Sequence, residues 1–198
     1  MDSFTLPPHT QALMFDADGT LIDTWSLHRA VWSELFATHG FTVTDAWWEE
    51  YAHEDLLTMV QAVLPGADEA MAYDMNAEGT RIYHQSLDRV ERIHHVTELA
   101  EAFHGSLPMA VVTAGFREVV MPTLEAVGIA HLFDAVVTGD DVPQIKPAPD
   151  GYRLAAQLLN VDPAHCVVFE DSDSGLTAAR AARMGTMVDV RGARLTVV

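Results

Sequence analysis

Two aspartates, two residues apart, follow a short apolar run near the start of the chain. Asp16 and Asp18 come after the run 12–15, and Gly19 beside them lets the chain turn. If the run is a strand of a parallel sheet, both carboxylates lie at its carboxyl end, where open α/β sheets bind ligands. Two carboxylates this close can divide roles, one as nucleophile or metal ligand and the other as proton donor and acceptor. A solvated Asp-Gly turn has the same pattern, so the pair alone leaves a catalytic and a structural interpretation open.

A second pair of acids follows another apolar run in the last fifth of the chain. Glu170 and Asp171 come directly after the run 166–169. Mg²⁺ typically takes oxygen ligands from one or two carboxylates together with a substrate phosphate. The stretch could also start a helix capped by Ser172 or Asp173, and capping is compatible with metal binding.

Thr113 and Lys146 are candidates for holding an anion. Thr113 follows the apolar run 109–112, and the backbone N–H groups after it open a predicted helix, although this segment taken alone favours an ordinary strand-to-helix turn. Lys146 is the one lysine of the chain, which otherwise uses arginine, and Pro147 and Pro149 follow it. A compact ammonium suits a phosphate oxygen. With the two acidic pairs, these residues suit phosphoryl transfer, which needs a nucleophile, an acid and base, a metal and a cation for the phosphoryl oxygens.

The elements that must position these residues alternate along the chain. Short apolar runs predict buried parallel strands at 12–15, 109–112, 135–137, 166–169 and 186–190. Helical patterns lie between the last four, at 117–127, 152–159 and 175–184. This alternation predicts a doubly wound α/β fold.

The long stretch between the first two strands is predicted to be almost wholly helical. Helices are expected at 26–38, 47–64 and 68–88. We interpret residues 24–92 as a helical cap inserted into an α/β catalytic core that comprises 1–23 and 93–198. His94 and His95 are expected in a boundary loop where the cap rejoins the core.

Composition excludes several classes of protein. The formal net charge is −18 and 49% of the residues are hydrophobic, which indicates a globular chain that repels nucleic acids and anionic membranes. One cysteine permits no internal disulfide. No apolar run reaches the length of a membrane span, and the start of the chain lacks a signal peptide. We therefore expect a soluble cytoplasmic protein whose partner is a small phosphorylated molecule. A monomer or weak dimer is a further expectation, which the sequence does not itself establish.

The four motifs, in this order, resemble those of the haloacid dehalogenase superfamily. The resemblance covers essentially the whole chain and implies a Rossmann-like doubly wound parallel sheet of strand order 3-2-1-4-5. The short helical cap after the first motif resembles the β-phosphoglucomutase-like branch. Segments 108–111, 131–137 and 166–171 are similar to small sugar phosphatases of the fructose-1-phosphatase type, which also act on 6-phosphogluconate.

This resemblance implies roles for the acidic residues. Asp16 matches the nucleophile that forms an aspartyl-phosphate, and Asp18 matches the general acid and base. Mg²⁺ would be held by the Asp16 carboxylate, the Asp18 backbone carbonyl and Asp171. Glu170 matches a metal-site acid that acts mainly through water. The implied activity is Mg²⁺-dependent hydrolysis of small phosphorylated metabolites, sugar phosphates above all.

The resemblance also implies which residues bind the substrate. Thr113 and Lys146 match the phosphoryl-binding pair, with the Ala114 N–H contributing. In the cap, His28 and Trp32 match positions typical of the branch. His53 is a candidate for contacting a sugar hydroxyl, although an exposed histidine at a helix start is the favoured interpretation.

Two departures from the family pattern bear on function. The mutases carry a glycine and an arginine in a cap loop, and the matching stretch here, 51–57, has neither. That arginine would bind the distal phosphate of a bisphosphate, so its absence favours a phosphatase. A mutase of the β-phosphoglucomutase type and a non-catalytic phosphate-binding protein remain the alternatives. Arg183 replaces a usual glycine, for which we expect a structural consequence.

Overall fold

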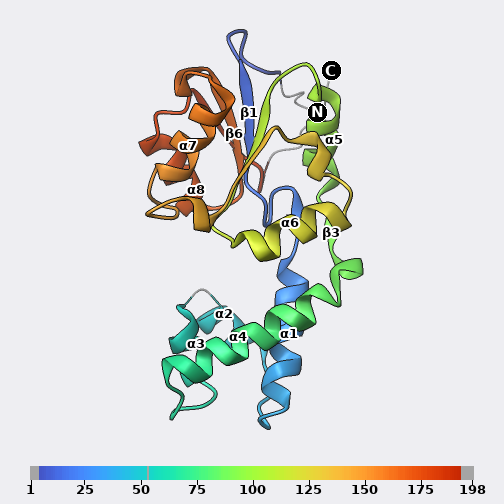
Figure 1. Ribbon diagram of the computed structural model, residues 1–198, viewed down its shortest axis with the longest axis vertical. Coiled ribbons are helices and arrows are strands. Elements are labelled where there is room, and N and C mark those ends of the chain that lie inside the picture. Colours follow the sequence, from blue (N-terminus) through green and yellow to red (C-terminus); the bar gives the residue numbers. More distant parts are fainter. Residues whose placement is uncertain (1–4, 53, 193–198) are drawn as a thin grey trace. The chain divides into compact units, whose positions relative to one another are not determined.

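The computed structural model describes residues 5–52 and 54–192 of the chain. It divides into two compact units (Figure 1). Met1–Asp23 and Val90–Val198 form the first, here called the α/β unit, and Thr24–Arg89 form the second, here called the helical unit. Among residues 5–52 and 54–192, no helix has the length and hydropathy of a membrane-spanning segment.

The α/β unit is built on a five-stranded parallel sheet. Its strands are β1 (Ala12–Phe15), β4 (Met109–Val112), β5 (Ala135–Val137), β6 (Cys166–Glu170) and β7 (Thr186–Asp189). They lie in the order β5-β4-β1-β6-β7, which is 3-2-1-4-5 when these five are counted along the chain. The predicted fold class and strand order are confirmed. The central strand, β1, is wholly buried because helices cover both faces of the sheet.

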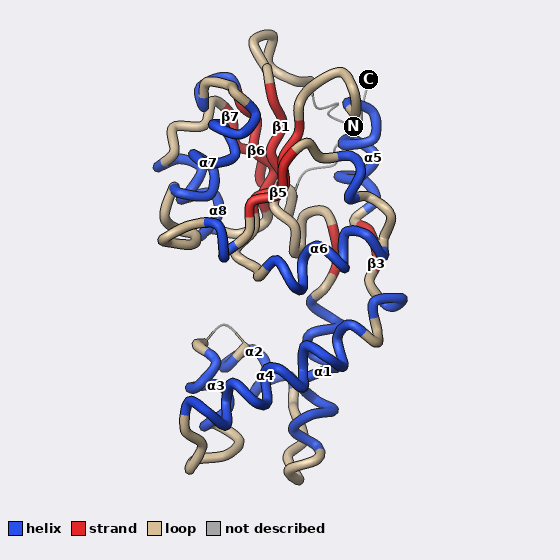
Figure 2. Tube along the Cα trace, in the orientation of Figure 1, coloured by secondary structure: helices blue, strands red, loops and turns tan. Residues whose placement is uncertain are grey.

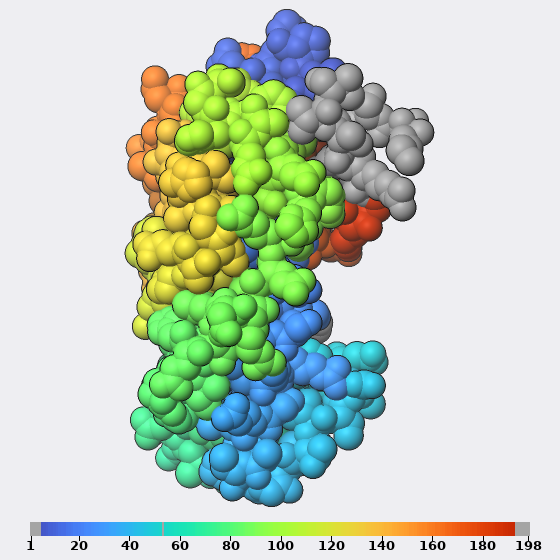
Figure 3. Space-filling view, turned by 90° about the vertical axis from the view of Figure 1, so that its right-hand side faces the viewer, coloured from blue at the N-terminus to red at the C-terminus, as the bar shows by residue number. Residues whose placement is uncertain are grey.

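Four helices cover the sheet, two on each face. Helices α7 (Asp150–Leu159) and α8 (Asp173–Ala181) lie on one side, and α5 (His94–Phe103) and α6 (Arg117–Ala126) on the other (Figure 1). The tube view shows the strands between these layers (Figure 2). In the space-filling view, green atoms, the colour of α5 and its neighbours in sequence, lie on the face of the α/β unit that is turned to the viewer (Figure 3). Short 3₁₀ turns at Ala130–Leu132, Gly139–Asp141 and Pro163–His165 connect the elements.

Helix α5 corrects one prediction. His94 and His95 were expected in a boundary loop, but they form the first turn of α5. Val96, Leu99 and Ala100 are at most 1% exposed. Their i, i+3, i+4 spacing gives this segment an apolar stripe, and burying that stripe stabilises a helix in spite of the polar residues at its start.

A small antiparallel pair of strands lies where the chain leaves and re-enters the α/β unit. Strand β2 (Ile22–Asp23) pairs with β3 (Glu91–Arg92), with Ile22 opposite Arg92. This pairing holds together the two chain segments that precede and follow the helical unit.

The helical unit has its own apolar core. Its helices are α1 (Trp25–Ala37), α2 (Asp45–Tyr51), α3 (Leu56–Gln61) and α4 (Glu69–His84), followed by a 3₁₀ turn at Leu87–Arg89. The fully buried Phe36 and Val60 belong to its central cluster. The single helix predicted at 47–64 is wrong, because Asp55 interrupts it and caps α3 by accepting the Thr58 N–H at 3.0 Å.

Candidate active site

The sheet brings the polar residues that follow its strands to one edge. Asp16 comes directly after β1, Thr113 after β4, and Glu170 is the last residue of β6. The loop after β5 carries Lys146. Because the strands are parallel, their carboxyl ends share this edge, and the Asp16 N–H donates to the Phe169 carbonyl at 3.0 Å.

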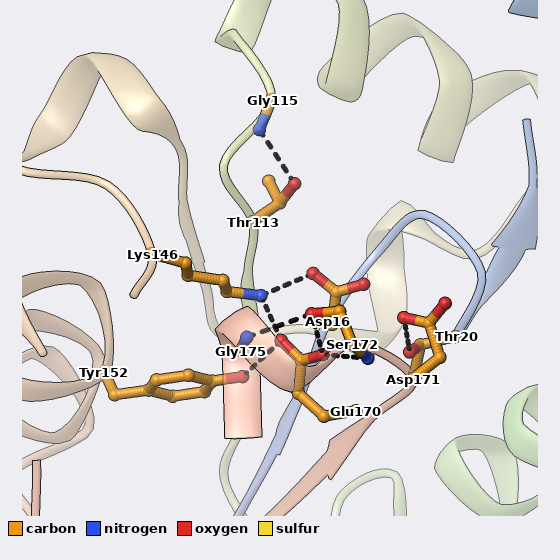
Figure 4. Close-up of polar contacts among 10 residues, drawn as sticks. All are labelled: Asp16, Thr20, Thr113, Gly115, Lys146, Tyr152, Glu170, Asp171, Ser172 and Gly175. Atoms are coloured by element: carbon orange, nitrogen blue, oxygen red, sulfur yellow. Dashed lines mark hydrogen bonds and ion pairs between the residues drawn. The ribbon is translucent and has the colours of Figure 1, made fainter. Parts of the chain in front are cut away.

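Lys146 lies between two buried carboxylates. Its Nζ donates to Asp16 Oδ1 and to Glu170 Oε1, each at 2.5 Å (Figure 4). The side chains are 8% exposed for Lys146, 10% for Asp16 and 0% for Glu170. A charged group this deeply buried must be paired, and here one ammonium serves two carboxylates. The fold therefore brings Asp16, Lys146 and Glu170 together, as the positions of the motifs predict.

Burial and crowded negative charge shift the titration of these groups. Burial raises the pKa of Asp16 to about 8, against the attraction of Lys146 and with added repulsion from Glu170. Burial also raises the pKa of Asp171, again with a contribution from Glu170. Burial alone would lower the pKa of Lys146, but the two carboxylates beside it raise the value above its usual range. The carboxylates at this edge outnumber the cation that serves them.

Glu170 is held by donors on both of its oxygens. Besides Lys146, the Tyr152 hydroxyl donates to Oε1 at 3.0 Å. The Ser172 N–H and Oγ donate to Oε2 at 3.0 and 2.9 Å. Tyr152 is fully buried on α7, where burial and the Glu170 charge raise the pKa of its phenol well above its usual range. No sequence signal distinguishes Tyr152 as a site residue, because its spacing indicates only a core-facing position of α7.

Asp171 completes an acidic group that fits a hard cation. Asp16, Glu170 and Asp171 each offer a carboxylate oxygen, and these oxygens lie within 4.8 Å of one another. Thr20 Oγ1 donates to Asp171 Oδ1 at 3.2 Å. Gly19 has φ +82°, and a Cβ there would lie 2.1 Å from Asp171 Oδ2, so only glycine fits. An all-oxygen donor set of this kind suits a divalent cation such as Mg²⁺, whose charge would favour the ionised forms of Asp16 and Asp171.

The loop after β4 lies beside Asp18. The Gly115 N–H donates to Thr113 Oγ1 at 3.0 Å, and Thr113 is 6% exposed. A Cβ on Gly115 would lie 3.7 Å from Asp18 Oδ2, which places the exposed Asp18 carboxylate next to this loop. Ala114, between the two, is exposed. Asp18 thus borders the predicted phosphate-binding loop, and its charge also helps to raise the pKa of Asp16.

The predicted cap residues belong to the helical unit. His28 stacks on Tyr83, with ring centroids 4.9 Å apart, and Trp32 contacts Phe36 at 5.2 Å. His53 lies outside the described residues. Whether any of the three contacts a substrate stays a prediction.

The start of α8 resolves which residue caps it. Ser172 Oγ accepts the Gly175 N–H at 2.9 Å, so Ser172 is the N-cap. Asp173, the other candidate, forms an ion pair with Arg191 at 2.8 Å. The capping serine also binds Glu170, so the same residue starts the helix and orients a carboxylate of the site.

This fold, with an acidic group and a buried lysine at the carboxyl edge of its sheet, is that of the haloacid dehalogenase-like hydrolases. The model of that family, described as "Haloacid dehalogenase-like hydrolase", matches residues 13–188. The chain therefore belongs to this family and is an enzyme of the hydrolase and phosphatase class. Membership implies a divalent metal, for which the acidic group supplies ligands.

Particular relatives refine the comparison. Fructose-1-phosphate phosphatase YqaB of Escherichia coli (strain K12) is 37% identical over 181 residues, covering 90% of this chain and 95% of that protein. A crystal structure of a CbbY variant from Rhodobacter sphaeroides with xylulose-(1,5)bisphosphate has a TM-score of 0.75 at 27% identity, covering 89% and 84% of the two chains. A putative β-phosphoglucomutase from Thermotoga maritima has a TM-score of 0.77 at 25% identity, covering 90% and 84%. These similarities confirm the predicted placement in the β-phosphoglucomutase-like branch, near sugar phosphatases.

Proposed function

We propose that this chain is a Mg²⁺-dependent phosphatase that hydrolyses small phosphorylated metabolites, sugar phosphates above all, through an aspartyl-phosphate. The observation that carries the proposal is Lys146 held between Asp16 and Glu170, with Asp171 completing an acidic group. One cation and several carboxylates at the carboxyl edge of the sheet can stabilise a phosphoryl group and attack it. The named activity of the Escherichia coli relative supports a sugar phosphate as substrate.

Asp16 and Asp18 would carry the two covalent steps. A carboxylate oxygen of Asp16 attacks phosphorus, the bond from phosphorus to the ester oxygen breaks, and Asp18 gives its proton to the leaving oxygen. Asp18 then takes a proton from a water molecule, whose oxygen attacks phosphorus as the bond to Asp16 breaks. Inorganic phosphate leaves, Asp16 is restored and Asp18 is again protonated.

The remaining residues would hold the phosphoryl group and the metal. Lys146, the Thr113 hydroxyl and the Ala114 N–H would bind the phosphoryl oxygens. The carboxylates of Asp16 and Asp171, with the Asp18 backbone carbonyl, would hold Mg²⁺. When bound, that ion supplies positive charge that offsets the charge of the transferred phosphoryl group.

Residues 24–92 would act as a substrate-selecting cap. In this proposal His28, Trp32 and His53 are the candidates for contacts with the sugar. The cap loop 51–57 carries Glu54 and Asp55 and no arginine, which disfavours a second phosphate on the substrate. A monophosphate with uncharged hydroxyls is the class that this loop fits.

Hydrolysis of p-nitrophenyl phosphate tests the proposal. Release of nitrophenol should require Mg²⁺ and be abolished by Asp16→Asn, which keeps the shape of the side chain but removes the nucleophile. Metal-independent release, or full activity of Asp16→Asn, would contradict the mechanism. A panel of phosphorylated metabolites ranked by kcat/KM would then identify the substrate class.

Mutase activity is the second candidate, supported by the similarity to the Thermotoga maritima protein. Incubation with β-glucose 1-phosphate and its bisphosphate activator separates the two reactions. A mutase forms glucose 6-phosphate, whereas a phosphatase releases inorganic phosphate. Phosphate binding without turnover of any ester would instead identify a non-catalytic binding protein.

A further inference from the structure

The Glu170 carboxylate receives four hydrogen bonds from the protein. Oε1 accepts from Lys146 and Tyr152, and Oε2 accepts twice from Ser172. A carboxylate has about four lone-pair sites, so these donors occupy its accepting capacity. A direct bond from Glu170 to a metal would have to displace one of them, whereas the side-chain donor to Asp171, Thr20 Oγ1, lies at a longer distance of 3.2 Å. Glu170 is thus arranged as the counter-ion of Lys146 and not as a direct metal ligand.

Tyr152 contacts both members of that ion pair. Its hydroxyl donates to Glu170 Oε1 at 3.0 Å, and its ring lies beside Lys146, with Nζ 5.3 Å from the ring centroid (Figure 4). The ring cannot move easily, because Tyr152 is 0% exposed and belongs to the apolar cluster between α7, α8 and the sheet. The phenol therefore ties the position of the ion pair to the packed core of the α/β unit.

Lys146 has one donor left for a ligand. An ammonium carries three N–H groups, and in the described part of the chain two of them go to Asp16 and Glu170. The direction of the third N–H group is set by the positions of the Asp16 and Glu170 oxygens that accept from the other two. Any group that fixes Glu170 therefore also fixes the direction in which Lys146 can donate to a phosphoryl oxygen.

We propose that Tyr152 is a positioning residue, whose hydroxyl fixes Glu170 as the counter-ion of Lys146 and thereby aims the ammonium at the phosphoryl group. This inference rests on the proposed phosphatase function. Tyr152 itself does not touch the reacting atoms. Its removal should weaken phosphate binding through Lys146 and leave the metal ligands nearly unaffected.

Tyr152→Phe tests the role, because it keeps the ring and removes only the hydroxyl. We expect kcat/KM to fall about tenfold and the dissociation constant of inorganic phosphate, measured by calorimetry with Mg²⁺ present, to rise by a similar factor. The dissociation constant of Mg²⁺ without phosphate should change by less than about threefold. A larger effect on Mg²⁺ than on phosphate would overturn the proposal, since Glu170 would then be a direct ligand.

A matched control and a double-mutant cycle separate positioning from general stability. Thr97→Val also removes one buried hydroxyl from the α/β unit, where Thr97 donates to the Ile93 and His94 carbonyls. It should leave phosphate affinity unchanged. In a Lys146→Met background, Tyr152→Phe should have no further effect on phosphate affinity, because the hydroxyl acts through Lys146.

The outcomes also separate this proposal from the proposed function. Phosphate affinity of Tyr152→Phe within about twofold of wild type, or an equal loss in the Lys146→Met background, would refute the positioning role. Failure of the wild-type chain to hydrolyse any phosphate ester with Mg²⁺ would refute the phosphatase function, even if the binding measurements gave the expected pattern.

Discussion

A methyl group on Gly175 would collide with the carboxylate that Lys146 binds. A Cβ at this position would lie 1.6 Å from Glu170 Oε1 and 1.9 Å from its carboxyl carbon. Glu170 cannot yield freely, because it is fully buried and Oε1 accepts from Lys146 and Tyr152. Gly175→Ala must therefore push Glu170 away from Lys146 or displace the first turn of α8.

Two costs and one gain set the size of the effect. Overpacking a well-filled site costs about 1–3 kcal/mol, and weakening a buried hydrogen-bonded group costs about 1–3 kcal/mol more. Alanine gains about 0.5–1 kcal/mol over glycine within a helix. We expect Gly175→Ala to lower the free energy of unfolding by about 3 kcal/mol. For a chain of this size, that loss corresponds to a Tm about 6–12 °C lower.

Gly79→Ala makes the same chemical change where there is room for it. Gly79 lies within α4, and a Cβ there would meet only Val31 Cγ1 at 3.7 Å and Leu35 Cδ2 at 3.9 Å. These are ordinary van der Waals contacts, so the gain in helix propensity is expected to dominate. This variant should raise the free energy of unfolding by about 0.5–1 kcal/mol and leave kcat/KM unchanged.

Thermal unfolding gives the Tm of both glycine variants. Phosphatase kinetics, measured well below the lower of the two Tm values, give their kcat/KM. For Gly175→Ala we expect kcat/KM to fall at least about tenfold, because Lys146 loses its counter-ion and its direction. A Tm equal to that of Gly79→Ala would refute the steric argument. A lowered Tm with kcat/KM within about twofold of wild type would refute the link from Glu170 through Lys146 to the phosphoryl group.

Three further changes test other parts of the reasoning. Arg183 has φ 63°, a left-handed conformation that costs an L-residue about 1–2 kcal/mol. Arg183→Gly should therefore raise the Tm measured by calorimetry by a few degrees and leave kcat unchanged. A lower Tm would contradict this. Asp18→Asn should reduce kcat by about 10²-fold or more. The loss should be greater for a sugar phosphate than for p-nitrophenyl phosphate, whose leaving group needs less protonation. Equal losses of kcat for the two substrates would argue against Asp18 as the general acid. Mg²⁺ at about 100 times its dissociation constant should raise the free energy of unfolding of the wild-type chain by about 2.7 kcal/mol. If Mg²⁺ raises the Tm of Asp171→Asn as much as that of the wild type, Asp171 is excluded as a ligand.

The parallel sheet could be predicted because its strands are buried on both faces. Runs such as 109–112 and 166–169 have no polar alternation, and turn signals and helical patterns separate them. The single helix expected at 47–64 failed for a local reason. An Asp that begins a helix and an Asp on the surface of a helix have the same sequence signal. The hydrogen bond that Asp55 accepts from the Thr58 N–H is what distinguishes them.

The site could be predicted at the level of motifs but not of contacts. Asp16, Lys146 and Glu170 follow separate strands, so the rule that carboxyl ends share an edge was sufficient to bring them together. Tyr152 lies at a position whose spacing indicates only that it faces the core. Its bond to Glu170 depends on how α7 packs on the sheet and on where β6 ends, and both are tertiary facts that no local pattern encodes.

The charge of the site reconciles an acidic chain with an anionic substrate. Three carboxylates and one ammonium, each counted as ionised, give Asp16, Glu170, Asp171 and Lys146 a formal charge of −2. Burial is the main cause of the raised pKa of Asp16, and the repulsion of Glu170 adds to it. Such a group repels a phosphate until a divalent cation neutralises it. Binding of the cation and binding of the phosphate must therefore be coupled, with the cation favouring the anion. In the proposed function, the chain's single lysine would act less as a general attractor of anions than as a directed donor. The groups that aim it would then matter more than the net charge of −18.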